Sequence, residues 1–143
     1  MRISKTIFTL LLCLLLLPLG GCSRHSTGDS PAPLRIVTEI DINFVDGPLH
    51  CRRHYNQDEK MSQVLAYLRQ IDPYGKPEED PVLADGSLFQ ISLTYSDGSK
   101  KVYEQKADRY LRLDDGPWET IDPSKAEALG QLLGTLPSDL EEI

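Results

Sequence analysis

The stretch "LFQISLTYSDGSKKVYEQK", residues 88–106, carries the strongest secondary-structure pattern in this chain. Apolar and polar residues alternate through residues 88–95, which is typical of a β-strand with one buried face. Asp97 and Gly98 form a turn dipeptide, and a second strand-like segment follows at residues 100–106. The stretch therefore predicts a β-hairpin. Its predicted buried face consists of Phe89, Ile91, Leu93 and Tyr95.

The register of this hairpin determines which side chains reach the surface. A loop of only two residues, Asp97-Gly98, places Ile91 opposite Glu104 and Ser92 opposite Tyr103. Since Ile91 lies on the predicted buried face, Tyr103 is expected on the face that points away from the core.

A similar alternation over residues 34–45 predicts a strand that precedes this hairpin. Asp46-Gly47 is the expected turn, and residues 49–55 form the expected returning strand. Counted from that turn, Asn43 faces His50 and Ile42 faces Cys51. The predicted inner face of the first strand consists of Leu34, Ile36, Thr38, Ile40, Ile42 and Phe44.

Two helices are expected from apolar residues that recur at helical spacing. Asn56 is the expected N-cap of the first helix, with Glu59 three residues later. Asp122 caps the second helix, and Pro123 occupies its first position, where proline is favoured. The first stripe contains Met61, Val64, Leu65, Leu68 and Ile71, and the second contains Ala126, Leu129, Leu132, Leu133 and Leu136.

The proline-rich residues 72–87 between these elements predict a loop. "RYLRL", residues 109–113, predicts a further strand, and residues 118–121 add a short one. The element order is therefore β-β-α-β-β-β-α with one additional short strand. This order predicts an α+β fold of two layers, with helices on one face of an antiparallel sheet and the other face exposed.

The N-terminus has the layout of a secretory signal peptide. Arg2 and Lys5 supply positive charge, and residues 7–17 are uncharged. An uncleaved membrane helix is the alternative, but the uncharged run is shorter than the roughly 20 apolar residues that a bilayer requires. Pro18 also interrupts its last turn.

Leu19-Gly20-Gly21-Cys22 resembles the lipobox of bacterial lipoproteins. The resemblance implies that the Cys22 thiol receives a diacylglycerol and that a peptidase cuts before this residue. Residues 1–21 are then the signal peptide, residues 22–33 the lipidated cysteine and a flexible tether, and residues 34–143 one α+β domain. Two or more acyl chains make membrane anchoring stable. The expected location is the extracytoplasmic side of the cell membrane or the outer membrane.

Charge and cysteine content limit the possible functions. Loss of Arg2 and Lys5 takes the formal net charge from −7 to −9, which argues against nucleic acid as a partner. Cys13 leaves with the leader and Cys22 carries lipid. Cys51 then remains alone, so no internal disulfide is expected.

"HCRRH", residues 50–54, contains two candidates for metal binding, His50 and His54. In the predicted strand these histidines point away from Cys51, and two arginines crowd any cation. The histidines are therefore weak candidates, and no metal or other cofactor is expected. No sequence motif indicates a catalytic residue.

Aromatic residues indicate an interaction surface on the exposed face of the sheet. Tyr110 precedes Leu111 and is expected to point the same way as Arg112. The predicted surface consists of Tyr103, Tyr110, Arg112 and Trp118.

These observations favour a lipid-anchored binding or accessory domain of the cell envelope with an envelope protein as its partner. The first alternative is a sensor of a small molecule, a metal or a cell-wall fragment. The second is an envelope hydrolase, because some active sites lack local motifs. Beyond its leader, the chain is similar only to small bacterial lipoproteins in general.

Overall fold

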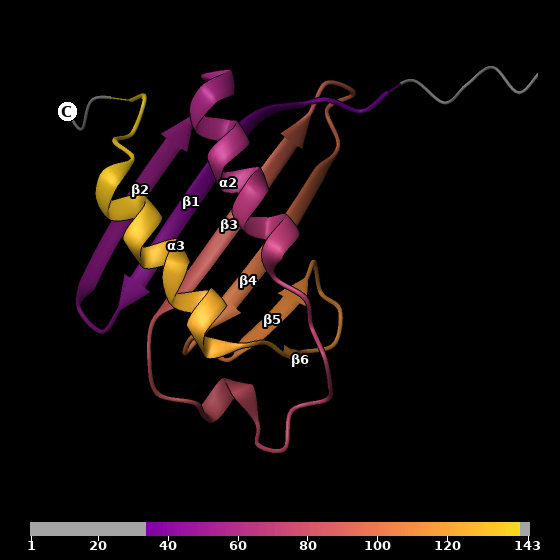
Figure 1. Ribbon diagram of the computed structural model, residues 1–143, viewed down its shortest axis with the longest axis vertical. Helices are drawn as coiled ribbons and strands as arrows, with labels where there is room; N and C mark the ends of the chain where they lie inside the picture. Colours follow the sequence, from indigo (N-terminus) through magenta and orange to yellow (C-terminus); the bar gives the residue numbers. More distant parts are fainter. Residues whose placement is uncertain (1–33, 141–143) are drawn as a thin grey trace, which may run out of the picture. The chain divides into compact units, whose positions relative to one another are not determined.

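The computed structural model describes residues 34–140, which form a six-stranded antiparallel sheet with two helices on one face (Figure 1). The strand order is β2-β1-β3-β4-β5-β6. The elements are β1 (Val37–Asp46), β2 (Leu49–Tyr55), α2 (Asp58–Gln70), the 3-10 turn η1 (Pro81–Leu83), β3 (Leu88–Tyr95), β4 (Lys100–Lys106), β5 (Tyr110–Leu113), β6 (Glu119–Thr120) and α3 (Pro123–Thr135). The predicted α+β fold is confirmed.

The predicted signal peptide, the lipidation site at Cys22 and the tether lie outside the described residues. Within residues 34–140, neither helix is both long enough and apolar enough to cross a bilayer.

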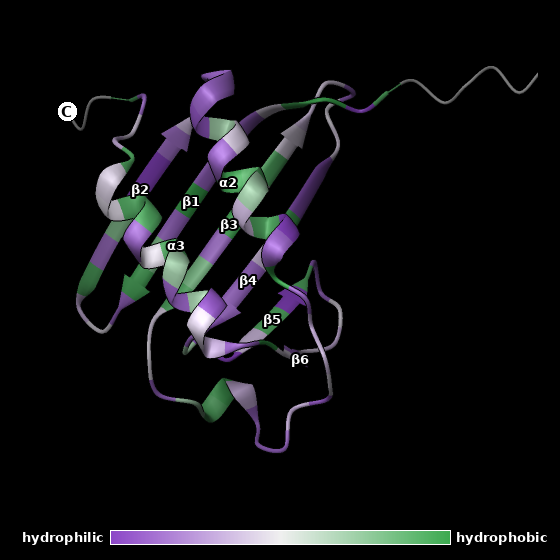
Figure 2. Cartoon of the chain, in the orientation of Figure 1, coloured by the Kyte–Doolittle hydropathy of each residue, from purple (hydrophilic) through white to green (hydrophobic). Residues whose placement is uncertain are grey.

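The core lies between the helices and the inner face of the sheet, which is the face toward α2 and α3. Ile42 and Ile91 lie opposite each other on the neighbouring strands β1 and β3 and are at most 1% exposed. Figure 2 shows the alternation of hydrophobic and hydrophilic residues along these strands. Both predicted helical stripes face this core, and Tyr67 joins them.

The β3–β4 hairpin differs from its predicted register by one residue. Ile91 pairs with Tyr103, and Ser92 pairs with Val102. The loop contains three residues rather than two, and its last residue, Gly98, has φ 81°. Since a one-residue shift exchanges the two faces of a strand, Tyr103 packs against the core. The prediction that Tyr103 lies on the outer face was wrong.

The same shift places Gln105 at the centre of the core. Its side chain is fully buried and its amide nitrogen donates to the Ala126 carbonyl oxygen at 3.1 Å. The Tyr67 hydroxyl donates to the Gln105 amide oxygen. Burial raises the pKa of Tyr67 well above its ordinary value, so this hydroxyl stays protonated. The predicted register would instead have turned Glu104 inward, where an unpaired charge is costly.

The β1–β2 hairpin also differs from its predicted register, but by two residues. Its loop is Gly47-Pro48, and Asp46 pairs with Leu49. Cys51 therefore faces Phe44 rather than Ile42. A shift of two residues keeps each side chain on its predicted face, so Cys51 still points toward the helices.

The start of β1 is the third difference from the prediction. Leu34 is 89% exposed and Ile36 is 64% exposed, so neither belongs to the core. A bulge between Val37 and Glu39 interrupts the pairing with β3. Because a bulge changes which way the preceding residues point, the alternation seen in the sequence does not continue into the sheet.

The predicted cap of α2 is wrong, whereas that of α3 is confirmed. Gln57 is the N-cap residue of α2 and makes no capping hydrogen bond with its side chain. The Asp122 carboxylate caps α3 by accepting from the Ser124 backbone N–H at 2.9 Å, with Pro123 at the first helical position.

Residues 72–87 form a loop that is attached to the sheet at two points. Gly75 forms an isolated antiparallel bridge with Thr120 beside β6. The Lys106 ammonium group donates to the Val82 carbonyl oxygen of η1 at 2.9 Å. Since Lys106 lies on the outer face, opposite the helices, the loop lies close to that face near β4 and β5.

Candidate binding surface

The outer face of the sheet carries a row of polar side chains that crosses four neighbouring strands. The register aligns Asn43 with Gln90, Gln90 with Glu104, and Glu104 with Arg112. We call this row, together with Trp118, the outer strip. Its members are Asn43, Gln90, Glu104, Arg112 and Trp118.

Hydrogen bonds connect the outer strip from Asn43 to Arg112, and a cation–π contact extends it to Trp118. The Asn43 amide nitrogen donates to the Gln90 amide oxygen at 3.5 Å, and the Gln90 amide nitrogen donates to Glu104 at 3.4 Å. The Arg112 guanidinium donates to the other Glu104 carboxylate oxygen. Its central carbon lies 4.7 Å from the centre of the Trp118 ring, at cation–π distance. The strip is therefore an ordered surface of amide, charged and aromatic groups.

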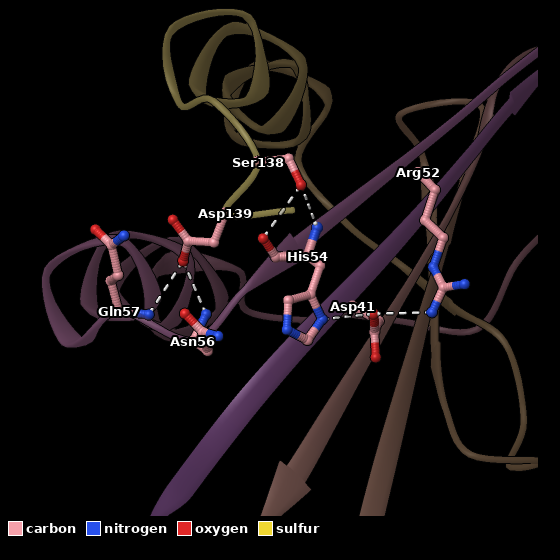
Figure 3. Close-up of polar contacts among 7 residues, drawn as sticks. All are labelled: Asp41, Arg52, His54, Asn56, Gln57, Ser138 and Asp139. Carbon is pink, nitrogen blue, oxygen red and sulfur yellow. Dashed lines mark hydrogen bonds and ion pairs between the residues drawn. The ribbon is translucent and has the colours of Figure 1, made fainter. Parts of the chain in front are cut away.

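A second polar cluster lies beside the outer strip on β1 and β2 (Figure 3). One carboxylate oxygen of Asp41 accepts from the Arg52 guanidinium at 3.2 Å and lies 3.0 Å from Nδ1 of His54. Burial alone would raise the pKa of Asp41, but the hydrogen bonds and charges of His54 and Arg52 hold it below its ordinary value.

The residues that follow α3 tie the end of β2 to the start of α2 (Figure 3). The Ser138 hydroxyl accepts from the His54 backbone N–H at 3.0 Å, and the Asp139 N–H donates to the His54 carbonyl oxygen at 2.8 Å. The Asp139 carboxylate accepts from the backbone N–H groups of Asn56 and Gln57 and from the Lys60 ammonium group. Asp139 thus replaces the expected local cap of α2.

Asp139 is held in its charged form by these contacts. Burial acts to raise its pKa, but the Lys60 hydrogen bond and the two backbone N–H groups lower the pKa below its ordinary value. A negative charge at this helix N-terminus is also favoured by the helix dipole.

Only two of the four residues predicted to form the interaction surface contribute to the outer strip. Arg112 and Trp118 belong to it, whereas Tyr103 faces the core. Tyr110 has the predicted orientation, because Lys106, its partner on β4, is on the outer face. However, Tyr110 is only 6% exposed and shares a hollow with Tyr74 and other residues of the loop.

The histidines of the "HCRRH" segment do not come together. Four residues of extended strand separate His50 from His54 by about 13 Å. His54 contacts Asp41, whereas His50 lies opposite Val45 and is exposed. In the part of the chain that the structure describes, no group of three or more potential metal ligands converges.

Sequence reasoning missed Asn43, Gln90 and Glu104. Asn43 and Gln90 each lie between two apolar residues of a strand, a pattern that indicates an outward side chain. Glu104 lies between Tyr103 and Gln105, so alternation does not assign its face. That pattern does not show which strands are adjacent, so it does not predict a connected row.

A second feature of this region is a hollow of about 720 Å³ beside Trp118. The Trp118 and Tyr74 rings line it together with Lys76 and Glu79, and four prolines complete its wall. Tyr74 is 69% exposed. The hollow thus offers aromatic faces next to charged groups of both signs.

No protein-family model, no curated protein and no solved structure matches this chain.

Proposed function

We propose that this protein is a non-enzymatic binding domain of the bacterial cell envelope, held at the membrane by lipid on Cys22. The outer strip is its binding surface, and an envelope protein is its partner. The observation that supports this function is the connected row of side chains on a sheet face that neither helix covers.

The pairing of charged side chains on the outer face favours binding over proton transfer. Glu104 already accepts from Arg112, and Asp41 already contacts both Arg52 and His54. Such pairs fix side chains in position before a partner arrives, which lowers the entropic cost of association. Arg and Trp are also the residue types that contribute most often to binding hot spots.

Site-specific photo-crosslinking in intact cells tests this proposal. A crosslinker replaces Ser92, which lies on the outer face beside the strip, or Gln131, which is exposed on α3 as the matched control. We expect a discrete adduct from position 92 and none from position 131. Arg112→Ala should remove most of that adduct, because it breaks the contacts to both Glu104 and Trp118.

A second variant tests the role of the lipid anchor separately from that of the binding surface. Cys22→Ala should release the protein from the membrane fraction and reduce crosslinking, without changing the unfolding temperature of the domain. Equal crosslinking from positions 92 and 131 would contradict the assignment of the outer face.

The hollow beside Trp118 favours one second candidate function, the binding of a cell-wall fragment. Sugar rings stack on aromatic faces such as Tyr74, and Lys76 and Glu79 supply partners for charged substituents. Muropeptides at 100 times their dissociation constant should add about 2.7 kcal/mol to the free energy of unfolding. Tyr74→Ala should remove this increase, and the absence of any increase would eliminate the candidate.

A further inference from the structure

A different part of the molecule, far along the sheet from Trp118, has the features of a peptide-docking site. β2 is an edge strand, since it pairs with β1 on one side only. The His54 backbone N–H and carbonyl groups both point to the other side, where Ser138 and Asp139 bind them. In an antiparallel strand these directions repeat every second residue. The backbone groups of Arg52 and His50 therefore point to the same open side.

Within residues 34–140, no strand lies beside these backbone groups. Among residues 34–140, no backbone hydrogen bond joins His50 or Arg52 to a segment on that side. The Cys51 thiol lies 4.0 Å from the Arg52 carbonyl oxygen. The contacts of Ser138 and Asp139 with His54 show that this edge accepts a neighbouring segment, and they end where the open part of the edge begins.

An apolar hollow of about 310 Å³ lies next to this edge, between the β1–β2 hairpin and α3. Apolar side chains from both elements line it, namely Ile42, Phe44, Leu49 and Leu133. Leu49 is 57% exposed. Gly130 and Gly134 form the helical wall, and a Cβ atom added at either position would meet no atom within 4 Å. The absence of side chains at two successive turns of α3 keeps the hollow open.

The charge of β2 indicates which peptide this site suits. Residues 49–55 contain two arginines and two histidines but no acidic residue, although the whole chain has a formal net charge of −7. Arg52 and His50 lie on the outer face of this edge, and Arg52 is 69% exposed. Leu49, Cys51 and Arg53 lie on the inner face and line the hollow, so Arg53 adds a positive charge beside its apolar wall.

We propose that the open edge of β2 and the adjoining hollow bind an extended peptide segment of a partner protein in which acidic and apolar residues alternate. The peptide adds a strand to the sheet, as in known β-augmentation. Its backbone pairs with His50 and Arg52. Its acidic residues lie on the outer face next to these side chains, and its apolar residues enter the hollow, because side chains of a strand alternate between faces.

Fluorescence anisotropy with a labelled hexapeptide that alternates Glu and Val tests the proposal on the full-length chain. A peptide with Lys in place of Glu is the matched control. We expect the acidic peptide to bind at least about tenfold more tightly than the basic one, and its affinity to fall as salt rises. Equal affinity for the two peptides would overturn the assignment.

Gly134→Leu tests the hollow, because a leucine there fills the space that the apolar residues of the peptide require. We expect a loss of affinity of at least about tenfold. Gly134→Ala is the control, since it gives the helix a similar gain in propensity but leaves most of the hollow empty. If Gly134→Leu fails to fold, Gly130→Leu lines the same hollow and serves the same purpose. Unchanged affinity in a folded leucine variant would overturn the proposal.

Amide hydrogen exchange locates the peptide and separates this proposal from the function of the outer strip. Bound peptide should slow exchange at His50 and Arg52. Arg112→Ala should leave peptide affinity unchanged, because β1, β3 and β4 separate its strand, β5, from β2. Protection at β5 and β6 instead of β2 would overturn the proposal. So would protection of His50 and Arg52 that rises with protein concentration alone, since it would assign the edge to a second copy of this chain.

Discussion

The β1–β2 and β3–β4 hairpins contain the same Asp-Gly dipeptide, yet they use it differently. In the β1–β2 hairpin Asp46 belongs to the strand, and the loop is Gly47-Pro48. In the β3–β4 hairpin Asp97 and Gly98 both belong to a loop that also includes Ser96. The same dipeptide thus spans the junction of strand and loop in one hairpin and lies entirely within the loop in the other.

Turn geometry explains this difference. Gly47 has φ 54°, and the proline ring fixes a negative φ at the next residue. Among the favoured two-residue turns, only type II′ combines these two values. In the second hairpin the Gly98 N–H donates to the Tyr95 carbonyl oxygen at 2.9 Å, and the positive φ falls at the last loop residue. This is the pattern of a three-residue loop.

The consequences for the surface also differ between the hairpins. A two-residue displacement in β2 leaves every side chain on its predicted face, whereas a one-residue displacement in β4 exchanges the faces. The candidate surface therefore gains Glu104 and loses Tyr103. In this sheet, only the one-residue shift changes which side chains belong to the candidate surface.

The largest expected effect tests the faces of β4. Gln105→Ala should lower the free energy of unfolding by about 3 kcal/mol, because it leaves a cavity and removes the partner of the Tyr67 hydroxyl. Glu104→Ala should cost no more than about 1 kcal/mol, since it removes a partly exposed ion pair. Urea unfolding measures both free energies. A larger loss for Glu104→Ala than for Gln105→Ala would support the register predicted from the sequence.

The next effect tests the register of the β1–β2 hairpin. Asn43 and Arg52 face each other, so Asn43→Cys combined with Arg52→Cys should form a disulfide that adds up to about 2.5 kcal/mol of stability. Asn43→Cys combined with His50→Cys, the pair of the predicted register, should remain reduced. Mass spectrometry of proteolytic fragments distinguishes the two results, and an oxidised control pair would argue against the observed loop.

A smaller loss of stability is expected from substitutions of the loop glycines. Gly47→Ala and Gly98→Ala should each cost about 1 kcal/mol, because both positions have a positive φ that alanine adopts poorly. Space is not the cause, since an added Cβ meets no atom within 4 Å at either site. Gly75→Ala has equal space without a positive φ, so its thermal unfolding should match the wild type. An equal loss at Gly75 would show that backbone conformation is not the reason.

The smallest expected effect is the pH dependence that Asp41 adds to the β1–β2 hairpin. A carboxyl group whose pKa is lower in the folded state stabilises the fold above its unfolded pKa, and this contribution disappears as the pH falls through the folded pKa. Asp41→Asn should therefore lower stability at pH 6 by less than about 1 kcal/mol, and this difference should shrink as the pH falls below the ordinary pKa of a carboxyl group. Asn43→Ala, which removes no titrating group, should keep the wild-type pH dependence of unfolding.

Much of the fold follows from local pattern. The alternation in β1 and β3 and the stripes of α2 and α3 arise from burial of one face, which leaves a direct mark on the sequence. Asp122 and Pro123 also mark the start of α3 in the sequence, because both act within one turn of the helix. The cap of α2 left no such mark, because Asp139 reaches it from the other end of the domain.

The candidate site was predicted only in part. Arg112 and Trp118 were expected from residue type and position, but their contact was not. Neither the outer strip nor the open edge of β2 has a motif, because both depend on which strands lie side by side. The aromatic residue Tyr110 shows the opposite error, since the loop near it hides a side chain that alternation places outside.

Local chemistry was enough to establish the class of fold, the two amphipathic helices and the exposed face of the sheet, because each depends on residues a few positions apart. Only the tertiary structure decided three other features. They are the exchange of faces in β4, the remote cap by Asp139 and the row from Asn43 to Trp118. Each depends on contacts between residues that are distant in sequence. The free energy of these contacts depends on burial and on hydrogen bonds that form only once the core has packed.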